Sequence, residues 1–471
     1  MTVTHPPPYD YDLIVIGSGP AGEMAAVEAG YLGKKVALIE KENVLGGAAT
    51  NTGTLPSKTL RETALFLAGF RQRALFGLDL SIATERITAR EFLYRERHVA
   101  EKEREKIRAR LDAQHVQVIT GTAAFESEHV LSISSPNADP HRVSGAVILI
   151  ATGSRPFRPP IFPTESPRVF DSDSILHIAQ LPKSMLIVGA GVIGCEYASI
   201  FACLGIAVSL VNSSEVLLPF LDTEVQDLLE KALVASGVRM IKSERVASVS
   251  ETDASITATM ESGTALSADC LLLATGRSSN TDGLGLENTG VELGKRGLIT
   301  VDPHYQTTNP DIYAAGDVIG FPSLASTSIG QARIAIEHAF RADDEELAPV
   351  VLPYGIYTIP ECAMAGEIED QLRSRGADFV VGKARYSDNA RGLIIGEEFG
   401  LLKLYFERNT RRLLGVHIIG EQATELVHLG VVALSAVATA DVFLRPAFNY
   451  PTLSELYKHA AYDAFGKPSI D

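Results

Sequence analysis

Two segments of the chain share one pattern of apolar and polar positions. Residues 11–40 read YDLIVIGSGPAGEMAAVEAGYLGKKVALIE, and residues 184–212 read SMLIVGAGVIGCEYASIFACLGIAVSLVN. In each, a short apolar run precedes a glycine turn, a stretch with helical spacing follows, and a second apolar run ends the segment. The pattern predicts strand, helix and strand in both places. We therefore expect an α/β protein with two Rossmann-like units.

The glycines of both turns have the spacing GxGxxG. A turn without side chains lets backbone N–H groups approach a pyrophosphate at a helix N-terminus, where the helix dipole favours an anion. One such turn is weak evidence, but two in full βαβ context predict two dinucleotide sites. The glycines are Gly17, Gly19 and Gly22 in the first unit and Gly189, Gly191 and Gly194 in the second.

The residue that ends the second strand of each unit indicates which ribose is accepted. Glu40 and Asn212 each stand about 20 residues beyond the first glycine, where an acidic side chain binds a ribose 2′-OH. Glu40 favours an unphosphorylated ribose, as in FAD or NAD. Asn212 is neutral and predicts a site that admits both NAD and NADP. The stretch NSSEVLL (212–218) has no arginine for a 2′-phosphate, so only Ser213 and Ser214 would add contacts there.

Three further stretches carry candidate chemistry. VILIATGSRP (147–156) and LLLATGRSSN (271–280) each run from a strand into ATG, and IYAAGDVIG (312–320) places Asp317 at a strand end. GGAATNTGTLPSK (46–58) predicts a glycine-rich loop whose lysine stands just before a long helical pattern. The first twelve residues of this loop include no Cys, His, Asp or Glu, so it offers no obvious nucleophile or base.

Composition narrows the class of protein. A chain of 471 residues predicts several domains, and 46% hydrophobic with 21% charged residues is typical of a globular protein. The net charge of −16 argues against nucleic acid as a partner. No apolar run is long enough to cross a bilayer, and the N-terminus lacks a secretory pattern, so we expect a cytoplasmic protein. The histidines lack metal-ligand spacing, and we assign no metal.

The cysteines do not form a recognisable redox or metal motif. None belongs to a CxxC pair, and each stands among apolar residues, which predicts buried free thiols in a reducing compartment. They are Cys195, Cys203, Cys270 and Cys362.

Taken in order, these motifs resemble the flavoprotein pyridine nucleotide–disulfide oxidoreductases, the family of dihydrolipoamide dehydrogenase and glutathione reductase. The resemblance covers almost the whole chain. It implies FAD as cofactor, NAD(P)(H) as substrates and a homodimer. It also implies an FAD-binding domain at 1–155 and 280–348, an NAD(P)-binding domain at 156–279 and an α+β dimerisation domain at 349–471. The cofactor-binding residues that the resemblance adds are Gly47, Thr54, Lys58, Gly153, Gly276 and Asp317.

The family's reactive groups are only partly present. Its redox cysteine pair falls on Ala49 and Thr54, and its C-terminal histidine base falls on Tyr450, so disulfide reduction by a thiol relay is not expected. Lys58 and Glu196 match the pair that the family places beside the flavin ring. As catalytic residues, the cation would stabilise the reduced ring and the carboxylate would hold the cation in place. An inherited internal salt bridge is the alternative interpretation of this pair.

One branch of the family departs from the pattern in nearly the same way. The soluble, flavin-dependent NAD(P) transhydrogenases resemble this chain in Thr54, in GTLPSK (53–58) and in NYPT (449–452), although they usually keep the first cysteine where this chain has Ala49. The resemblance implies ping-pong hydride exchange between NAD(H) and NADP(H) through FAD. Two alternatives remain: an NAD(P)H:quinone reductase or diaphorase of the same fold, and a redox-inert nucleotide-binding scaffold.

Two remaining stretches predict structure rather than chemistry. Residues 90–111 alternate charge at helical spacing, which predicts a solvated surface helix. Residues 399–420 read as two strands with alternating apolar positions around a polar NTRR turn, followed by apolar helices that would pack across a two-fold axis.

Overall fold

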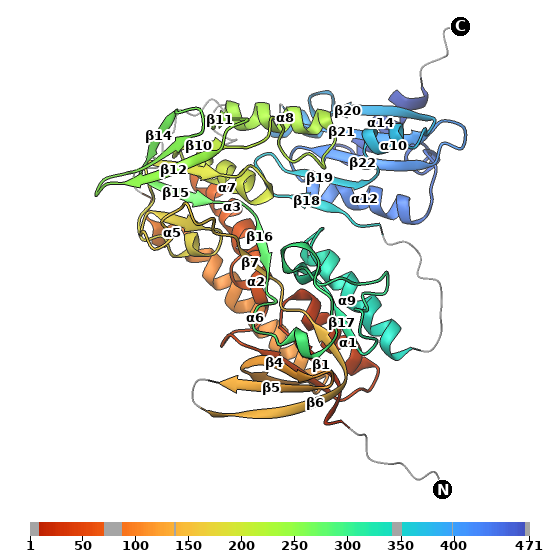
Figure 1. The fold of residues 1–471 in the computed structure, drawn as a ribbon. Helices are drawn as coiled ribbons and strands as arrows, with labels where there is room; N and C mark the ends of the chain where they lie inside the picture. Colours follow the sequence, from red (N-terminus) through yellow and green to blue (C-terminus); the bar gives the residue numbers. More distant parts are fainter. Residues whose placement is uncertain (1–8, 70–86, 136–137, 342–350, 398, 467–471) are drawn as a thin grey trace. The chain divides into compact units, whose positions relative to one another are not determined.

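The computed structural model describes residues 9–69, 87–135, 138–341, 351–397 and 399–466 (Figure 1). The chain forms two compact units, each assembled from three separate stretches. The first contains residues 1–59, 93–157 and 276–346, and the second contains 60–92, 158–275 and 347–471. The three domains expected from the sequence stay a prediction, and their boundary between residues 348 and 349 lies outside the described residues.

The first βαβ segment forms as predicted. It consists of β1 (Tyr11–Ile16), α1 (Pro20–Tyr31) and β2 (Val36–Glu40). Strand β1 pairs in parallel with β2 on one side and with the end of β6 (Ala138–Ile150) on the other. The sheet has the order β3-β2-β1-β6-β5-β4, and β17 also pairs with β6. The other strands are β3 (Gln117–Thr120), β4 (Thr122–Ser127), β5 (Val130–Ser135) and β17 (Ile312–Ala314).

Alternate residues of β1 serve two hydrophobic cores. Leu13 and Val15 face helices α1, α6 (Tyr94–Ala113) and α9 (Ala325–Phe340), where a row of alanines lets α1 and α9 pack closely. Ile14 and Ile16 face the β4–β5 hairpin. The predicted surface helix is confirmed as α6, preceded by the short α5 (Ala89–Phe92), and most of its charged residues are exposed.

The second βαβ segment also forms as predicted, with β9 (Ser184–Val188), α7 (Val192–Cys203) and β10 (Ala207–Val211). Its parallel sheet has the order β11-β10-β9-β15-β8. Helix α7 is buried along its whole length from Gly194, which explains why its sequence is apolar on every side. The other elements are β8 (Val169–Asp171), α8 (Thr223–Ala235), β11 (Arg239–Ile241), β12 (Val246–Glu251), β13 (Ile256–Met260), β14 (Ala265–Ala268) and β15 (Cys270–Leu273).

Each of the two ATG motifs stands directly after a strand. Strand β6 ends before the first motif and β15 before the second. The short strands that follow, β7 (Ser154–Pro156) and β16 (Arg277–Ser279), pair with each other as an antiparallel ribbon. Two stretches that are far apart in the sequence are thereby held side by side.

The C-terminal part is an antiparallel sheet with the order β18-β19-β22-β21-β20, covered on one face by α12 and α14. The predicted hairpin is confirmed as β21 (Leu401–Glu407) and β22 (Leu413–Ile419). Among the described helices, none is long and apolar enough to cross a membrane. The other elements are β18 (Tyr354–Ile356), β19 (Cys362–Gly366), α10 (Glu369–Ser374), β20 (Phe379–Arg385), α11 (Ala390–Ile395), α12 (Ala423–Ser435), α13 (Asp441–Leu444) and α14 (Glu455–Phe465).

The polar positions of β21 are buried as well, which the alternating pattern did not predict. Lys403 is 4% exposed, and its Nζ lies 3.1 Å from Oδ2 of Asp222 and 3.3 Å from Oε2 of Glu369. The hydroxyl of Tyr405 donates to the same Asp222 oxygen. Since Asp222 also caps α8 by accepting from the backbone N–H of Glu224, this buried cluster fastens α8 to the C-terminal sheet.

We predict that Lys403→Met lowers the free energy of unfolding by about 3–5 kcal/mol, because it leaves a buried carboxylate without its cation. The control is Lys383→Met on β20, which removes a 43% exposed lysine from Glu224 and should cost about 1 kcal/mol or less. Denaturant unfolding of both variants measures the difference. Equal losses would contradict the buried pair as the source of stability.

The loss should also depend on pH. Burial raises the pKa of Asp222, but the hydrogen bond from Tyr405 and the charge of Lys403 outweigh it and hold this pKa below its ordinary value. A depressed carboxyl pKa supplies stability above the unfolded-state pKa of about 4, and this stability is lost as pH falls through the folded-state pKa. The difference between wild type and Lys403→Met should therefore be largest near neutral pH and shrink below about pH 4.

Candidate functional site

The stretch that the sequence predicts as a loop, residues 46–58, is mostly helical. Helices α2 (Gly47–Asn51) and α3 (Thr54–Ala68) are separated by only two residues. Lys58 therefore lies inside α3 and not before it, so this part of the prediction was wrong. The glycines and the proline stand at or next to helix starts. In the first turn of a helix the backbone N–H groups have no partner within the helix, so proline, which lacks an N–H, is tolerated there.

The start of α2 lies against the first glycine turn. Gly47 has φ +54°, and a Cβ on it would stand 2.9 Å from the Cα of Gly19. Asn51 fixes this arrangement by donating to the carbonyls of Leu45 at 3.0 Å and Gly47 at 2.8 Å. Two of the predicted cofactor-binding residues, Gly19 and Gly47, are thus brought together with backbone facing backbone.

The three positions of the first turn require glycine for different physical reasons. A Cβ on Gly17, which has φ +103°, would stand 2.4 Å from the carbonyl oxygen of Ala151, and one on Gly22 would stand 1.9 Å from that of Gly17. Protein packing therefore requires both. Gly19 has φ −66° and a Cβ there would meet only the Cα of Gly47 at 4.0 Å, so the fold itself does not demand glycine. The free space in front of the N-terminus of α1 fits a bound dinucleotide pyrophosphate.

Glu40 organises this turn. It is 6% exposed, and its Oε2 accepts from the backbone N–H of Ser18 at 2.9 Å and from the Ser18 hydroxyl. The same hydroxyl accepts from the backbone N–H of Gly46 at 3.0 Å. Glu40 therefore links the end of β2, the glycine turn and the start of α2. Its predicted contact with a ribose hydroxyl would come in addition to this structural role.

Another predicted residue, Asp317, is held beside the β7–β16 ribbon. The hydroxyl of Ser154 donates to Oδ2 of Asp317 at 2.7 Å and accepts from Nε of Arg277 at 2.7 Å. Their neighbours Gly153 and Gly276 have positive φ, and a Cβ on either would meet nothing within 4 Å. The glycines are needed here for backbone conformation and not for close packing.

The second glycine turn repeats the geometry of the first. A Cβ on Gly189, which has φ +104°, would stand 2.4 Å from the carbonyl oxygen of Ala274, and one on Gly194 would stand 1.8 Å from that of Gly189. Gly191 again has open space, with no atom within 4 Å of a Cβ. The middle glycine of each turn is therefore the one that a ligand, and not the fold, would require.

The structure limits what Asn212 can do. Its Nδ2 donates to the carbonyls of Ser214 and Val216, each at 2.9 Å, so both amide hydrogens are used to shape its own turn. The sequence predicted that the neutral Asn212 admits a ribose with or without a 2′-phosphate. Donation to a phosphate would break this turn, whereas Oδ1 can still accept from a ribose hydroxyl.

Glu196 lies on α7, is 3% exposed, and accepts at Oε1 from the backbone N–H of Tyr357 at 2.9 Å. The next carbonyl, that of Thr358, accepts from Nε of Arg61 at 3.0 Å. Helices α3 and α7 therefore hold adjacent residues of one segment.

Lys58 stands one helical turn before Arg61 and donates to the hydroxyl of Ser57 at 3.2 Å. Lys58 belongs to the first unit and Glu196 to the second, and their pairing stays a prediction.

Sequence reasoning missed Arg61 and Glu361. Both are buried, at 2% and 6% exposed, and Nη2 of Arg61 lies 3.1 Å from Oε1 of Glu361. Oε2 of Glu361 accepts from both the backbone N–H and the hydroxyl of Thr424, at the start of α12. No local sequence signal distinguishes these charged residues from surface ones, because the two stand far apart in the chain.

The cysteines have the predicted environment, and this prediction is confirmed. All four are buried thiols that belong to no disulfide. Burial raises the pKa of Cys270 and of Cys362 to about 12 and raises that of Cys195 further still. These three are therefore uncharged near neutral pH and poor nucleophiles. Ala49 lies within α2 and Thr54 begins α3, so neither position of the family's disulfide carries sulfur.

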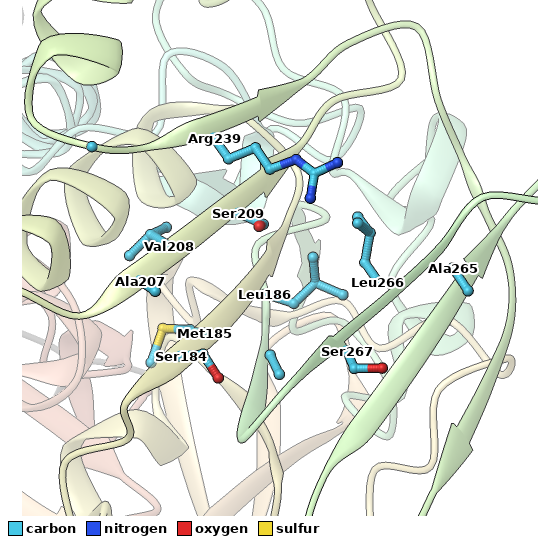
Figure 2. Close-up of a pocket in the computed structure, with 12 residues that line it drawn as sticks. Ser184, Met185, Leu186, Ala207, Val208, Ser209, Arg239, Ala265, Leu266 and Ser267 are labelled. Atoms are coloured by element: carbon cyan, nitrogen blue, oxygen red, sulfur yellow. The ribbon is translucent and has the colours of Figure 1, made fainter.

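The structure also contains a groove of about 340 Å³ on the second unit, shown in Figure 2. It is lined by the first residues of β9 and β10, by Arg239 and by β14. Because the glycine turn follows the other end of β9, this groove does not belong to the nucleotide site. Among the described residues, no group of three or more His, Cys, Asp or Glu side chains could hold a metal ion.

Two glycine turns that each follow a strand of a parallel pair, with a separate antiparallel sheet near the C-terminus, are typical of an oxidoreductase with two dinucleotide sites. The chain belongs to the pyridine nucleotide-disulphide oxidoreductase family, whose model matches residues 11–339, with the dimerisation domain of that family at residues 352–461.

Similar proteins cover nearly the whole chain. A protein of Mycobacterium tuberculosis named soluble pyridine nucleotide transhydrogenase is 42% identical over 97% of this chain and 98% of its own length. The protein of that name from Escherichia coli is 38% identical over 98% and 99%. Among solved structures, LpdA of M. tuberculosis has a TM-score of 0.88 at 29% identity, covering 95% of this chain and 98% of its own. The HOCl-induced flavoprotein disulfide reductase RclA of E. coli has a TM-score of 0.86 at 28% identity, and the match covers 96% of this chain and 99% of its own.

Gly19→Val and Gly191→Val form a matched pair of tests. Both residues have extended or ordinary backbone angles and free space, so valine should fold in either place. We expect Gly19→Val to purify without FAD. Gly191→Val should keep FAD, while its absorbance no longer bleaches with NADH or NADPH. Full flavin content in Gly19→Val, measured by absorbance after denaturation, would contradict the first site.

Replacing all four cysteines by serine or alanine should leave flavin-dependent turnover within about threefold of wild type. Each change costs stability on the order of 1 kcal/mol, the typical value for a point substitution. Circular dichroism verifies that the variant is folded before its rate is measured. A folded variant without activity would reveal a thiol that takes part in the reaction.

Proposed function

We propose that this protein is an FAD-dependent soluble pyridine nucleotide transhydrogenase, which moves hydride between NAD(H) and NADP(H). The observation that carries the proposal is the combination of two complete glycine-turn sites with Ala49 and Thr54 at the disulfide positions. Electrons that enter such a protein cannot pass to an internal disulfide. They leave to a second nucleotide or to a small external acceptor. Relatives that match over nearly the full chain are named transhydrogenases, which supports a second nucleotide as the acceptor.

The site residues would act mainly by binding and orienting. FAD, when bound, supplies a carrier that takes up and returns hydride. The turn around Gly19 would hold its pyrophosphate, and the turn around Gly191 would hold that of NAD(P)(H). Lys58 would place a positive charge beside the reduced ring, and Glu196 would fix the lysine in position. Tyr357 would in turn orient Glu196 through its backbone N–H.

An anaerobic assay of the purified holoenzyme decides between this function and its rivals. NADPH and thio-NAD⁺ are supplied together, and a quinone panel is run beside them. Thionicotinamide reduction faster than quinone reduction supports the transhydrogenase. The reverse order makes the protein an NAD(P)H:quinone reductase, which the absence of the disulfide also permits. A flavin that stays oxidised with both nucleotides would leave only a nucleotide-binding scaffold.

We predict that Lys58→Met slows flavin reduction by about two decades while FAD stays bound, the usual scale for losing one pre-organised electrostatic group. Lys106→Met, which changes a 67% exposed lysine on α6, is the control and should reduce at the wild-type rate. Stopped-flow absorbance measures both. An unchanged rate in Lys58→Met would leave the lysine a purely structural role.

We further propose a cytoplasmic homodimer that uses the C-terminal domain as its interface. Large apolar side chains are exposed within the matched dimerisation domain, among them Val432 at 69% and Tyr450 at 71%. Light scattering should give the mass of two chains even at low micromolar concentration. A fully active monomer would contradict this assembly.

A further inference from the structure

The turn after β10 packs against the segment that follows β11. The backbone N–H of Asn212 donates to the carbonyl of Ile241 at 2.8 Å, and the carbonyl of Asn212 accepts from Glu244 at 3.0 Å. The N–H of Ser243 donates to the carbonyl of Ser214 at 3.3 Å. Residues 242–244 therefore lie directly beside the position where the second unit would meet the adenosine ribose.

The two units differ at this place. In the first unit, the carbonyl of Glu40 accepts from the backbone N–H of Gly121, which follows β3 and has no side chain. In the second unit, the corresponding segment after β11 carries Lys242 and Ser243. The register of β2 with β3 places Thr120 of the first unit at the position that Lys242 has in the second, so only the second unit has a cation at the ribose edge. Neither Lys242 nor Ser243 belongs to the stretch 212–218, because both follow the neighbouring strand β11.

Lys242 and Ser243 both hold the carboxylate of Glu215. Nζ of Lys242 lies 3.0 Å from Oε1 of Glu215, and the hydroxyl of Ser243 donates to its Oε2 at 3.0 Å. These hydrogen bonds hold the pKa of Glu215 below its ordinary value. A second carboxylate, that of Glu230, lies 2.9 Å from the same lysine. An ammonium and a hydroxyl on two oxygens of one anion are also the donors that a phosphate monoester takes.

We propose that Lys242 and Ser243 form the subsite for the 2′-phosphate of NADP(H), and that Glu215 occupies this subsite when no phosphate is present. The inference rests on the proposed function and names the residues that set its nucleotide preference. The side chain of Glu215 is 70% exposed and can turn away into solvent without leaving a cavity. Lys242 is only 26% exposed and stays anchored by Glu230.

The proposal gives the two charged residues opposite effects. Binding of NADP(H) must displace Glu215 and then uses Lys242, whereas NAD(H) requires neither step. Glu215 therefore favours NAD(H) by competition, and Lys242 supports NADP(H). Asn212 contributes little to this choice, because its amide hydrogens are already bound within its own turn.

The test uses the purified holoenzyme and two probes that need no turnover, adenosine 2′,5′-bisphosphate and 5′-AMP. Isothermal titration should show that Lys242→Met weakens the binding of the bisphosphate about tenfold or more, which is the scale of one charge-assisted hydrogen bond. Glu215→Gln should tighten it, and neither change should alter 5′-AMP binding by more than about twofold. Lys231→Met, which changes an exposed lysine on α8, is the matched control and should change neither.

Because the two variants should move the affinity in opposite directions, partial misfolding cannot imitate the expected result. Unchanged bisphosphate affinity in Lys242→Met, or weaker affinity in Glu215→Gln, would overturn the proposal. Failure of the proposed function looks different: NADPH would not reduce thio-NAD⁺, while bisphosphate binding would still depend on Lys242. If thio-NAD⁺ reduction proceeds and the Lys242→Met preference for NADPH over NADH equals that of wild type, only the subsite fails.

Discussion

The close contact between each glycine turn and the strand beneath it is the constraint on which the rest depends. At Gly22 and Gly194 a side chain would stand less than 2 Å from the carbonyl oxygen of the first glycine of its own turn. This approach points the N-terminus of α1 and of α7 at the carboxyl edge of its sheet. The free space at Gly19 and Gly191 then lies in front of unpaired helix N–H groups, where an anionic pyrophosphate is favoured.

Buried charges hold the pieces of the second unit together. Arg61 with Glu361 joins α3 to the start of α12, and Lys403 with Asp222 joins the C-terminal sheet to α8. Each pair makes further hydrogen bonds, from Arg61 to the carbonyl of Thr358 and from Tyr405 to Asp222, and such bonds help a buried ion pair to be tolerated. The resulting frame fixes Tyr357 against Glu196, so the geometry of a proposed catalytic carboxylate depends on residues far from it in the sequence.

Loss of the disulfide changes what this fold can do without changing the fold. The family relatives that include a flavoprotein disulfide reductase superpose on the chain over nearly its whole length. Here the cysteines are buried among apolar groups, and burial raises the pKa values of three of them so far that these thiols stay protonated near neutral pH. In the proposed reaction, hydride is therefore exchanged at the nucleotide sites and not through a thiol pair.

The sequence by itself determined both βαβ segments, the surface helix, the C-terminal hairpin and the burial of the cysteines. Each depends on local periodicity or on spacing within one segment, which a single chain displays directly. It misjudged residues 46–58, because glycine and proline mark helix starts as well as loops. Only the tertiary structure decided that Lys403 is buried, that Arg61 meets Glu361 and that Lys242 lies beside Asn212. Contacts between distant segments follow from packing and strand order, and no local pattern records them.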